Sequence, residues 1–315
     1  MDVVASLLEG PRARDAFVIR TQMAAPWALR IEDGAALTVV VILEGQCRLE
    51  HDSLNTPMAL DAGDLVVIRG PDPYVIGDAE GSHPRIRILP GNRPVLMNGD
   101  EIGQTMNLGL RTWGALSEVG DTTKLLTGIY EDVGEASRRL LDAIGAVVVR
   151  TGAAQASAYV GLLAAESLSD SAGQSAVLDR LLDLVLVDTV RDHFARNPQR
   201  APGWYSALQD DLVGSALRAV HADPAAPWSV TGLAANVGLS RSAFSRRFGE
   251  TVGEPPMAYV KRWRLSLAAD HLADPDLTVG RVASLVGYQS PFTFSAAFKA
   301  HFGVSPSDYR AALDR

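Results

Sequence analysis

The chain contains one pattern twice, as SVTGLAANVGLSRSAFSRRF at residues 229–248 and as TVGRVASLVGYQSPFTFSAAF at residues 278–298. Equivalent positions are 49 residues apart as far as Gly238 and Gly287, and 50 residues apart in the second half of each copy. About a dozen matches occur in the same order, which chance does not readily produce. We therefore predict two copies of one helical unit.

Each copy has the pattern of two short helices joined by a tight turn. Ser229 and Thr278 are residue types that cap helix N-termini. Gly238 and Gly287 supply the residue that enters a left-handed turn without penalty. The second helices carry phenylalanines four residues apart, so both rings face the first helix: Phe244 with Phe248, and Phe294 with Phe298. These features predict two helix-turn-helix units.

The outer faces of the two second helices differ in chemistry. The first carries side chains that reach phosphates and guanine edges in a major groove, namely Arg241, Ser242, Ser245 and Arg246. The second carries Pro291, Phe292, Thr293 and Ala296, with Lys299 as a nearby cation. Phe292 and Ala296 suit thymine methyl groups but offer guanine no paired donors. We predict that the first unit supplies most base specificity and the second mainly positions the protein and reads DNA shape.

A helix predicted from Pro256 to Leu272 joins the two copies. Its 17 residues would span roughly 25 Å, and successive major grooves lie about 34 Å apart. Modest DNA bending or an offset between the helices would let both units reach adjacent grooves. The KRWR run at 261–264 is spread around this helix, so at most two of its side chains face DNA, and Trp263 is expected in the core. For Arg247, the sequence leaves two roles open, a phosphate contact and a surface ion pair.

The stretch from Leu208 to Tyr309 resembles the DNA-binding domain of the AraC/XylS family of bacterial transcriptional regulators. The resemblance covers about 100 residues and both helix-turn-helix units. It implies that bases are read by Ser242, Ser245 and Arg246, with Arg241 near the backbone. APWALRI at 25–31, LEGQCRLE at 43–50 and LDAGDLVVIRG at 60–70 are similar to the cupin-like sensor domains of some family members.

The N-terminal part is predicted to be β-rich. Short strands between Ala16 and about Leu89 are separated by turn residues: FVIRTQM, WALRI, ALTVVVIL, QCRLEH, DLVVIR, YVIG and IRIL. This spacing favours an antiparallel barrel or sandwich, and Gly45 predicts a hairpin between ALTVVVIL and QCRLEH. A helical period follows from about Glu131, with a long amphipathic helix at about 176–196. The sequence NPQRAPG at 197–203 ends this helix and marks a linker.

The predicted fold is therefore α+β with two domains. Residues 1–196 form a cupin-like sensor and dimerisation domain, with an antiparallel β-barrel at about 1–115 and accessory helices at about 131–196. A linker covers residues 197–207. Residues 208–315 form an all-α domain with two helix-turn-helix units joined by a linker helix.

Charge and cysteine content limit the possible functions. The net charge of −8 conceals an asymmetry, because residues 1–211 carry −11 and residues 212–315 carry +3. Cys47 is the single cysteine, which excludes an internal disulfide framework and a four-thiolate metal site. No signal peptide or membrane span is predicted, so we expect a cytoplasmic protein that does not interact with membranes.

A metal-dependent cupin enzyme is the chief alternative in another class. Such an enzyme needs clustered histidine ligands, whereas TVVVILEG has none and GDLVVIRGPDPYVIGD places Tyr74 near an expected ligand position. The six histidines are isolated and are expected at surface or capping positions. An alkyl-accepting repair protein is a second alternative, but Cys47 has the pattern of a buried, inert thiol. We expect no enzyme activity, metal or cofactor.

The sequence thus predicts a sequence-specific transcriptional regulator controlled by a small-molecule effector. Trp27, Arg30 and Tyr74 lie in the segments expected to line a barrel pocket. Expected partners are double-stranded promoter DNA, an unidentified effector, RNA polymerase if the protein is an activator, and a second copy of the chain. The 176–196 helix is expected either to pack against that copy or to pack on its own barrel. Activation and repression are not distinguished.

Overall fold

The computed structural model describes residues 17–109, 111–116, 122–153 and 157–313, and it divides them into two compact units. The barrel unit holds the described residues up to Val133 together with residues 144–196. The helical unit holds residues 134–143 and the described residues from Asn197 onward. The short segment 134–143, expected in the sensor domain, therefore groups with the helical unit.

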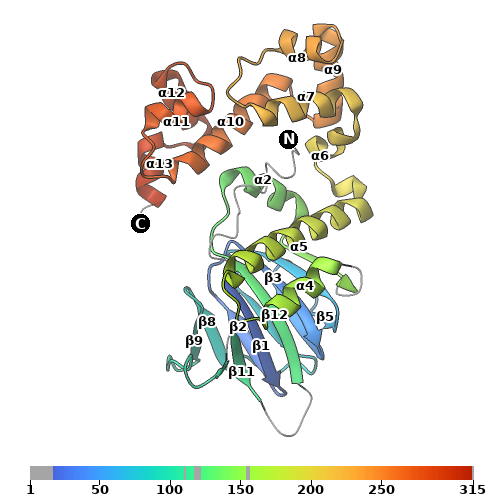
Figure 1. Cartoon of the computed structure of the whole chain (residues 1–315), viewed down its shortest axis with the longest axis vertical. Helices are drawn as coiled ribbons and strands as arrows, with labels where there is room; N and C mark the ends of the chain where they lie inside the picture. Colours follow the sequence, from blue (N-terminus) through green and yellow to red (C-terminus); the bar gives the residue numbers. More distant parts are fainter. Residues whose placement is uncertain (1–16, 110, 117–121, 154–156, 314–315) are drawn as a thin grey trace. The chain divides into compact units, whose positions relative to one another are not determined.

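Two β-sheets form the barrel unit (Figure 1). Sheet A contains, in spatial order, β10 (Asn107–Gly109), β11 (Thr112–Ala115), β1 (Phe17–Ala24), β12 (Thr122–Tyr130), β3 (Leu37–Glu44), β6 (Leu65–Arg69) and β13 (Val147–Arg150). Sheet B contains β5 (Met58–Asp61), β4 (Gln46–His51), β7 (Tyr74–Asp78), β2 (Ala28–Ile31), β8 (Ile86–Leu89) and β9 (Arg93–Leu96). Neighbouring strands are antiparallel except for the parallel pairs β1–β11 and β2–β8. The predicted β-rich, cupin-like first domain is confirmed.

The core of this unit consists of the inward-facing side chains of both sheets. Val40, Ile42 and Val66 of sheet A belong to one buried cluster with Leu49 and Ile76 of sheet B. Six consecutive residues of β3, from Leu37 to Ile42, are buried, so neither face of this strand is exposed. A strand buried on both faces needs a cover on its outer side.

The predicted hairpin at Gly45 is wrong. β3 pairs with β12 and β6 in sheet A, whereas β4 pairs with β5 and β7 in sheet B. Gly45 has a φ of +78°, and a Cβ atom there would lie 3.0 Å from the Thr122 carbonyl oxygen. The chain therefore crosses from one sheet to the other at this glycine. β3 and β4 do not pair with each other, because strands that are more distant in the sequence occupy both edges of each.

The barrel also extends beyond residue 115. β12 lies inside sheet A, where it pairs with both β1 and β3, and β13 pairs with β6. The described residues in the middle of the chain also form the helices α2 (Glu135–Ile144), α4 (Ala158–Glu166) and α5 (Gln174–Arg196). The long amphipathic helix predicted at about 176–196 is α5.

Helix α5 covers the outer face of sheet A, with α4 beside it (Figure 1). Gly128 of β12 permits a close approach, since a Cβ atom at this position would lie 2.5 Å from Leu182 Cδ1. The Tyr130 hydroxyl donates to Asp183 Oδ1 at 3.2 Å. At the start of α5, the Arg111 guanidinium donates to Gln174 Oε1 at 3.2 Å.

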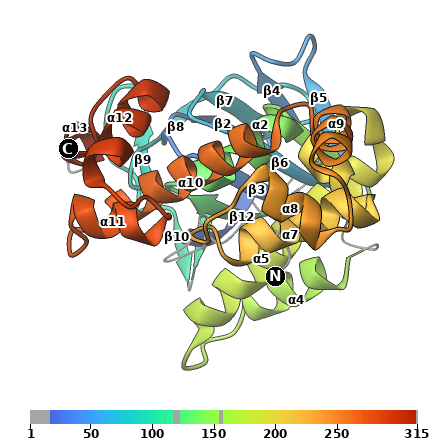
Figure 2. The ribbon, with the colours of Figure 1, turned by 90° about the horizontal axis from the view of Figure 1, so that it is seen from above.

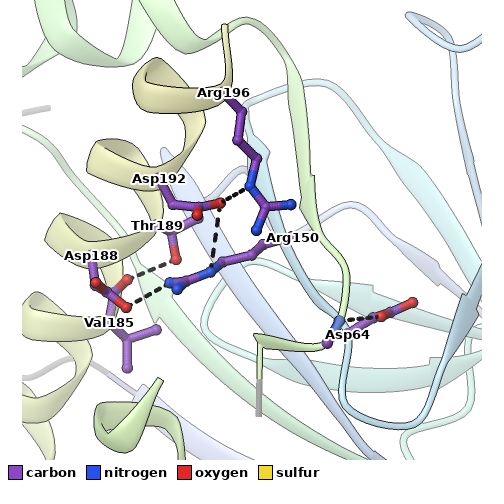
Figure 3. Close-up of polar contacts among 8 residues, drawn as sticks. Asp64, Arg150, Val185, Asp188, Thr189, Asp192 and Arg196 are labelled. Atoms are coloured by element: carbon purple, nitrogen blue, oxygen red, sulfur yellow. Dashed lines mark hydrogen bonds and ion pairs between the residues drawn. The ribbon is translucent and has the colours of Figure 1, made fainter. Parts of the chain in front are cut away.

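Arg150 attaches the last turns of α5 to the edge strand β13 (Figure 3). Its side chain is 8% exposed and lies 2.5 Å from Asp188 Oδ2 and 3.6 Å from Asp192 Oδ2. Arg196 joins the same Asp192 carboxylate at 2.9 Å. Just beyond β13, the Gly152 amide donates to Asp64 Oδ1 at 2.9 Å. The buried guanidinium therefore fixes the helix that leads into the linker.

The helical unit contains the predicted repeat. Besides α2, its described α-helices are α6 (Gly203–Ser206), α7 (Asp211–Ala222), α8 (Val230–Asn236), α9 (Arg241–Val252), α10 (Pro256–Leu272), α11 (Val279–Leu285), α12 (Pro291–Phe302) and α13 (Pro306–Leu313). Ser229 accepts from the Gly232 amide and Thr278 from the Arg281 amide, so both predicted N-caps are confirmed. Gly238 and Gly287 have φ values of +69° and +80°.

Helix α10 contributes to the cores of both helix-turn-helix units (Figure 2). Near its start, Tyr259 packs edge-on against Phe248 with ring centroids 5.9 Å apart. Near its end, Leu265, Ala268 and Leu272 belong to a cluster with Phe294 and Phe298. All four phenylalanines of the repeat are buried, as predicted.

Asp270 of α10 caps helix α2 within the helical unit. Its carboxylate accepts hydrogen bonds from the Glu135 amide at 2.5 Å and the Ala136 amide at 3.2 Å. These amides belong to the first turn of a helix, where they have no intrahelical acceptor and where a negative charge is favourable.

Asp188→Asn tests the role of the Arg150 network in stability. Burial by itself raises the pKa of Asp188, but the hydrogen bonds from Arg150 and Ser157, together with the charges of Arg150 and Arg191, hold that pKa below its usual value. A lowered folded-state pKa adds stability above the unfolded-state value of about 3.9, and that stability is lost as the pH falls through the folded-state value. We expect Asp188→Asn to lower the free energy of unfolding at pH 7 by about 1.5–3 kcal/mol.

The measurement is urea denaturation of the full chain at pH 7 and at acid pH, followed by circular dichroism. The variant should also lose less stability than the wild type on acidification. Glu44→Gln, which removes the exposed pair with Lys124, is the control and should cost less than about 1 kcal/mol. Equal stability of Asp188→Asn and wild type at pH 7 would contradict the assigned role.

Candidate DNA-binding surface and effector cavity

Helix α9 presents the side chains predicted for base reading. The Ser240 hydroxyl caps the helix by accepting from the Ala243 amide at 3.2 Å. Phe244 and Phe248 face the interior, whereas Arg241, Ser242 and Arg246 are exposed and Ser245 is half-buried. The four polar residues occur at positions one, two, five and six of the helix, so they share one face. The structure brings this predicted set together.

Arg247 belongs to the fold rather than to this surface. Its guanidinium bonds to Asp210 Oδ2 through Nε at 2.9 Å and Nη2 at 2.8 Å. Asp210 also caps α7 by accepting from the amides of Leu212 and Val213. Burial by itself raises the pKa of Asp210, but these amides and Arg247 together lower it. Of the two alternatives for Arg247, the geometry favours the ion pair.

The apolar residues predicted for the outer face of α12 are exposed to solvent. Phe292 is 88% exposed at the start of the helix, which is high for an aromatic side chain. Thr293, Ala296 and Lys299 are also exposed, whereas Phe294 is buried. This unit therefore offers one flat ring and one cation on its free face.

The KRWR run of α10 divides among several roles. Arg262 pairs with Glu254, and Trp263 is buried as predicted. Arg264 donates to the carbonyl oxygens of Pro224 at 2.7 Å and Ala226 at 2.6 Å, so it fixes the loop before α8. Lys261 is exposed, which leaves it as the side chain of this run best placed to contact a phosphate.

A cavity of about 230 Å³ lies between the two sheets of the barrel unit. Its wall comes from both sheets and is mainly apolar, with Ile19, Leu29, Ile31, Val40, Ile76, Ile88, Leu125 and Ile129 among the lining residues. Tyr74, predicted as an effector contact, is one of them. Burial raises the pKa of Tyr74 well above its usual value, so its hydroxyl stays protonated.

The other two predicted effector contacts lie elsewhere. Trp27 lines a second cavity of about 460 Å³ together with loop residues such as His83 and Arg85. Arg30 does not line the apolar cavity; it bonds to Glu32 at 2.5 Å and borders a third hollow, which Tyr74 also lines. The structure therefore does not bring Trp27, Arg30 and Tyr74 to one site.

Asp33 and Trp113 line the apolar cavity and were missed from the sequence. Asp33 directly follows β2, and Trp113 lies in the edge region of sheet A, where no strand was predicted. Strand alternation is the signal that favours Leu29 and Ile31 over Arg30, because alternate side chains point to opposite faces.

Residues suited to metal or redox chemistry are scattered. Among the described residues, no group of three or more His, Cys, Asp and Glu side chains is placed to hold a metal ion. Cys47 is buried, and burial together with Asp64 and Asp61 raises the pKa of its thiol to about 12. His51 and His221 are buried rather than exposed, and His221 stacks on Trp263 with ring centroids 4.2 Å apart. No described helix is long and apolar enough to cross a membrane.

Two parts of the chain match known protein families. Residues 2–195 match the family model described as Cupin, and residues 233–312 match a Helix-turn-helix domain. A putative AraC-like transcription regulator of Streptomyces lividans is 31% identical over 90% of both chains. The HTH-type transcriptional regulator AlkR of Acinetobacter baylyi is 38% identical over 48% of this chain and 50% of its own length.

A solved AraC-type transcriptional regulator structure from Chromobacterium violaceum covers 32% of this chain and 91% of its own, at 26% identity and a TM-score of 0.31.

A cupin fold followed by paired helix-turn-helix units defines the class of DNA-binding transcriptional regulators. Within that class, the chain belongs to the family of AraC-like transcription regulators. Like these relatives, it is a transcriptional regulator and not an enzyme.

Two adjacent arginines of α9 provide a matched test of the surface. Arg246→Ala removes an exposed cation from the polar face, so we expect DNA affinity to fall by about 1–3 kcal/mol if it reads a base. Arg247→Ala removes the same charge but breaks the bond to Asp210, so we expect a lower Tm and near wild-type affinity. Fluorescence anisotropy and thermal denaturation measure the two quantities. A loss of affinity from Arg247→Ala as large as that from Arg246→Ala would refute this assignment.

Proposed function

We propose that this AraC-like regulator binds promoter DNA sequence-specifically through Arg241, Ser242, Ser245 and Arg246, under the control of a small molecule bound in its apolar barrel cavity. The observation that carries the DNA contact is the exposed polar face of α9 above a core of buried phenylalanines. Such a regulator works in the cytoplasm, where it meets DNA and, as an activator, RNA polymerase.

Unequal readout by the two units is part of this proposal. Arg246 offers paired donors to guanine, whereas Phe292 offers thymine an apolar contact or inserts at a flexible base step. Lys299 and Lys261 supply positive charge that positions the duplex without reading its sequence. The first unit then supplies most base discrimination, and the second supplies placement and shape readout.

Strand β12 offers a route from effector to DNA-binding domain. Leu125, Thr127 and Ile129 line the cavity, while Gly128 and Tyr130 on the opposite face contact α5. A ligand that shifts β12 would therefore shift the helix that leads into the linker. Effector binding then changes the population of chains in which the DNA-binding domains fit adjacent half-sites.

Fluorescence anisotropy with a duplex from the region upstream of the coding sequence, and with a shuffled duplex, tests the DNA-binding proposal at two salt concentrations. We expect tighter binding to the upstream duplex at both. Arg246→Ala should reduce the ratio of the two affinities, whereas Phe292→Ala should weaken both and change the ratio less. Equal binding of wild type to both duplexes would contradict sequence-specific recognition of this region. Equal losses of discrimination in the two variants would contradict the division of labour.

We also propose that the protein is a homodimer joined through α4 and α5. One face of α5 packs on its own barrel, but the opposite faces of the two helices leave large apolar side chains exposed, namely Tyr159, Leu162, Val177 and Leu184. These residues recur three and seven positions apart, so each helix presents one apolar stripe. Adjacent exposed apolar stripes are typical of protein–protein interfaces.

Leu162→Glu combined with Leu184→Glu tests this interface. We expect the wild type to have twice the chain mass of 33.6 kDa and the double variant to have a mass near 33.6 kDa, because the charges are buried without partners on association. Light scattering after size exclusion gives the masses. Met97→Glu, at a residue 56% exposed on the barrel, is the control. A double variant that remains dimeric would place the interface elsewhere.

A further inference from the structure

The apolar cavity contains one ionisable carboxyl group, that of Asp33, among the described residues that line it, and it contains no Lys, Arg or His. Its volume of about 230 Å³ is more than ten times the roughly 10–15 Å³ that one water molecule needs. The wall is therefore shaped for a small organic molecule with a large apolar part, and the charged group at its edge decides which polar group that molecule carries.

Asp33 is half-buried and lacks a cationic partner in the described part of the barrel. Its carboxylate accepts the Ala35 amide at 3.0 Å. The neighbouring cations are bound by another residue, since Arg30 and Arg87 both pair with Glu32. Burial raises the pKa of Asp33, and the like charge of Glu131 adds to this effect. A ligand cation would replace the hydration that burial removes.

The remaining polar groups of the wall are neutral. Tyr74 keeps its proton, as described above, and Trp113 is 9% exposed with an indole Nε1 that has no hydrogen-bond partner among the described atoms. Asn92 and Thr127 also line the cavity. An anionic ligand would meet Asp33 with no compensating cation, whereas an ammonium group would form a charge-assisted hydrogen bond there.

We infer that the barrel cavity binds a small apolar amine, with its ammonium group on the Asp33 carboxylate and its hydrocarbon part against Ile31, Val40 and Ile76. This inference rests on the proposed effector role of the cavity. It specifies the class of ligand, which that proposal leaves open. The second cavity, which contains His83 and Arg85, has the opposite charge preference and would select an anion.

Isothermal titration calorimetry of the full chain with n-heptylamine, 1-heptanol and heptanoate tests the inference, because the three probes share one hydrocarbon chain. We expect the amine to bind at least tenfold more tightly than the alcohol, and heptanoate to bind most weakly. Asp33→Asn should weaken the amine at least tenfold and leave the alcohol within about threefold. A tenfold change corresponds to 1.4 kcal/mol.

Two further variants locate the site. Glu101→Gln removes a carboxylate that is 71% exposed and outside the cavity, and it should leave all three affinities unchanged. Thr127→Phe fills the cavity and should abolish binding of the amine and the alcohol. Tighter binding of heptanoate than of the amine, absence of amine binding, or amine binding that survives Thr127→Phe would overturn the inference. The wild-type probe series decides the matter if Asp33→Asn fails to fold.

A parallel anisotropy titration with the upstream duplex separates this inference from the proposed function. A change in DNA affinity with heptylamine, lost in Asp33→Asn, supports both. Asp33-dependent amine binding that leaves DNA affinity unchanged keeps the ligand class and contradicts effector control. A change in DNA affinity with heptanoate but not with the amine overturns the ligand class and keeps effector control.

Discussion

The packing of α5 against sheet A is the constraint on which the barrel unit depends. β3 and β12 are buried on both faces, so without this helix their outer side chains would face water. Gly128 makes room for the Leu182 side chain of the helix, Tyr130 and Arg150 bind its acidic side chains, and Arg111 binds its first turn. Because these contacts are spread along the helix from its first turn to its last turns, α5 and sheet A form one rigid unit.

In the helical unit, α10 has the corresponding position. It contributes Tyr259 to the first helix-turn-helix core and Leu272 to the second, so the two units share one rigid element. Arg264 adds polar contacts at both ends of this arrangement, because it donates to the loop before α8 and to the Gly287 carbonyl at 3.4 Å. The spacing of the two DNA-facing helices is therefore built into a single helix.

The helical unit could be predicted closely because its determinants are local. The caps Ser229 and Thr278, the turn glycines and the paired phenylalanines each act within about 20 residues, and the repeat shows them twice. Seven of the eight barrel strands up to Leu89 could also be predicted, but not the short edge strand β5 (Met58–Asp61) and not which strands pair. β3 and β4 were assigned to one hairpin, although they lie in different sheets.

Strand β12 was missed for a different physical reason. Its sequence TTKLLTGIY mixes Thr, Lys and Gly with apolar residues, and burial on both faces removes the alternation that identifies a strand. A set of pocket residues based on segments rather than on strand faces includes Arg30 and omits Asp33. The DNA-facing residues of α9 needed only a helical period and were found together.

Helix α2 belongs to the helical unit although it precedes the linker in sequence, and this limits how the molecule can be divided. Within the residues that the structure describes, the polypeptide passes between the two units after Val133, after Ala143 and after Arg196. A fragment that begins at Asn197 lacks α2, and the Asp270 carboxylate then loses the two amide donors that it caps. A fragment that ends at Arg196 keeps α2 without that cap. Neither product of a cut at the linker is a complete unit, so limited proteolysis or domain exchange at this point separates residues that belong to one compact body.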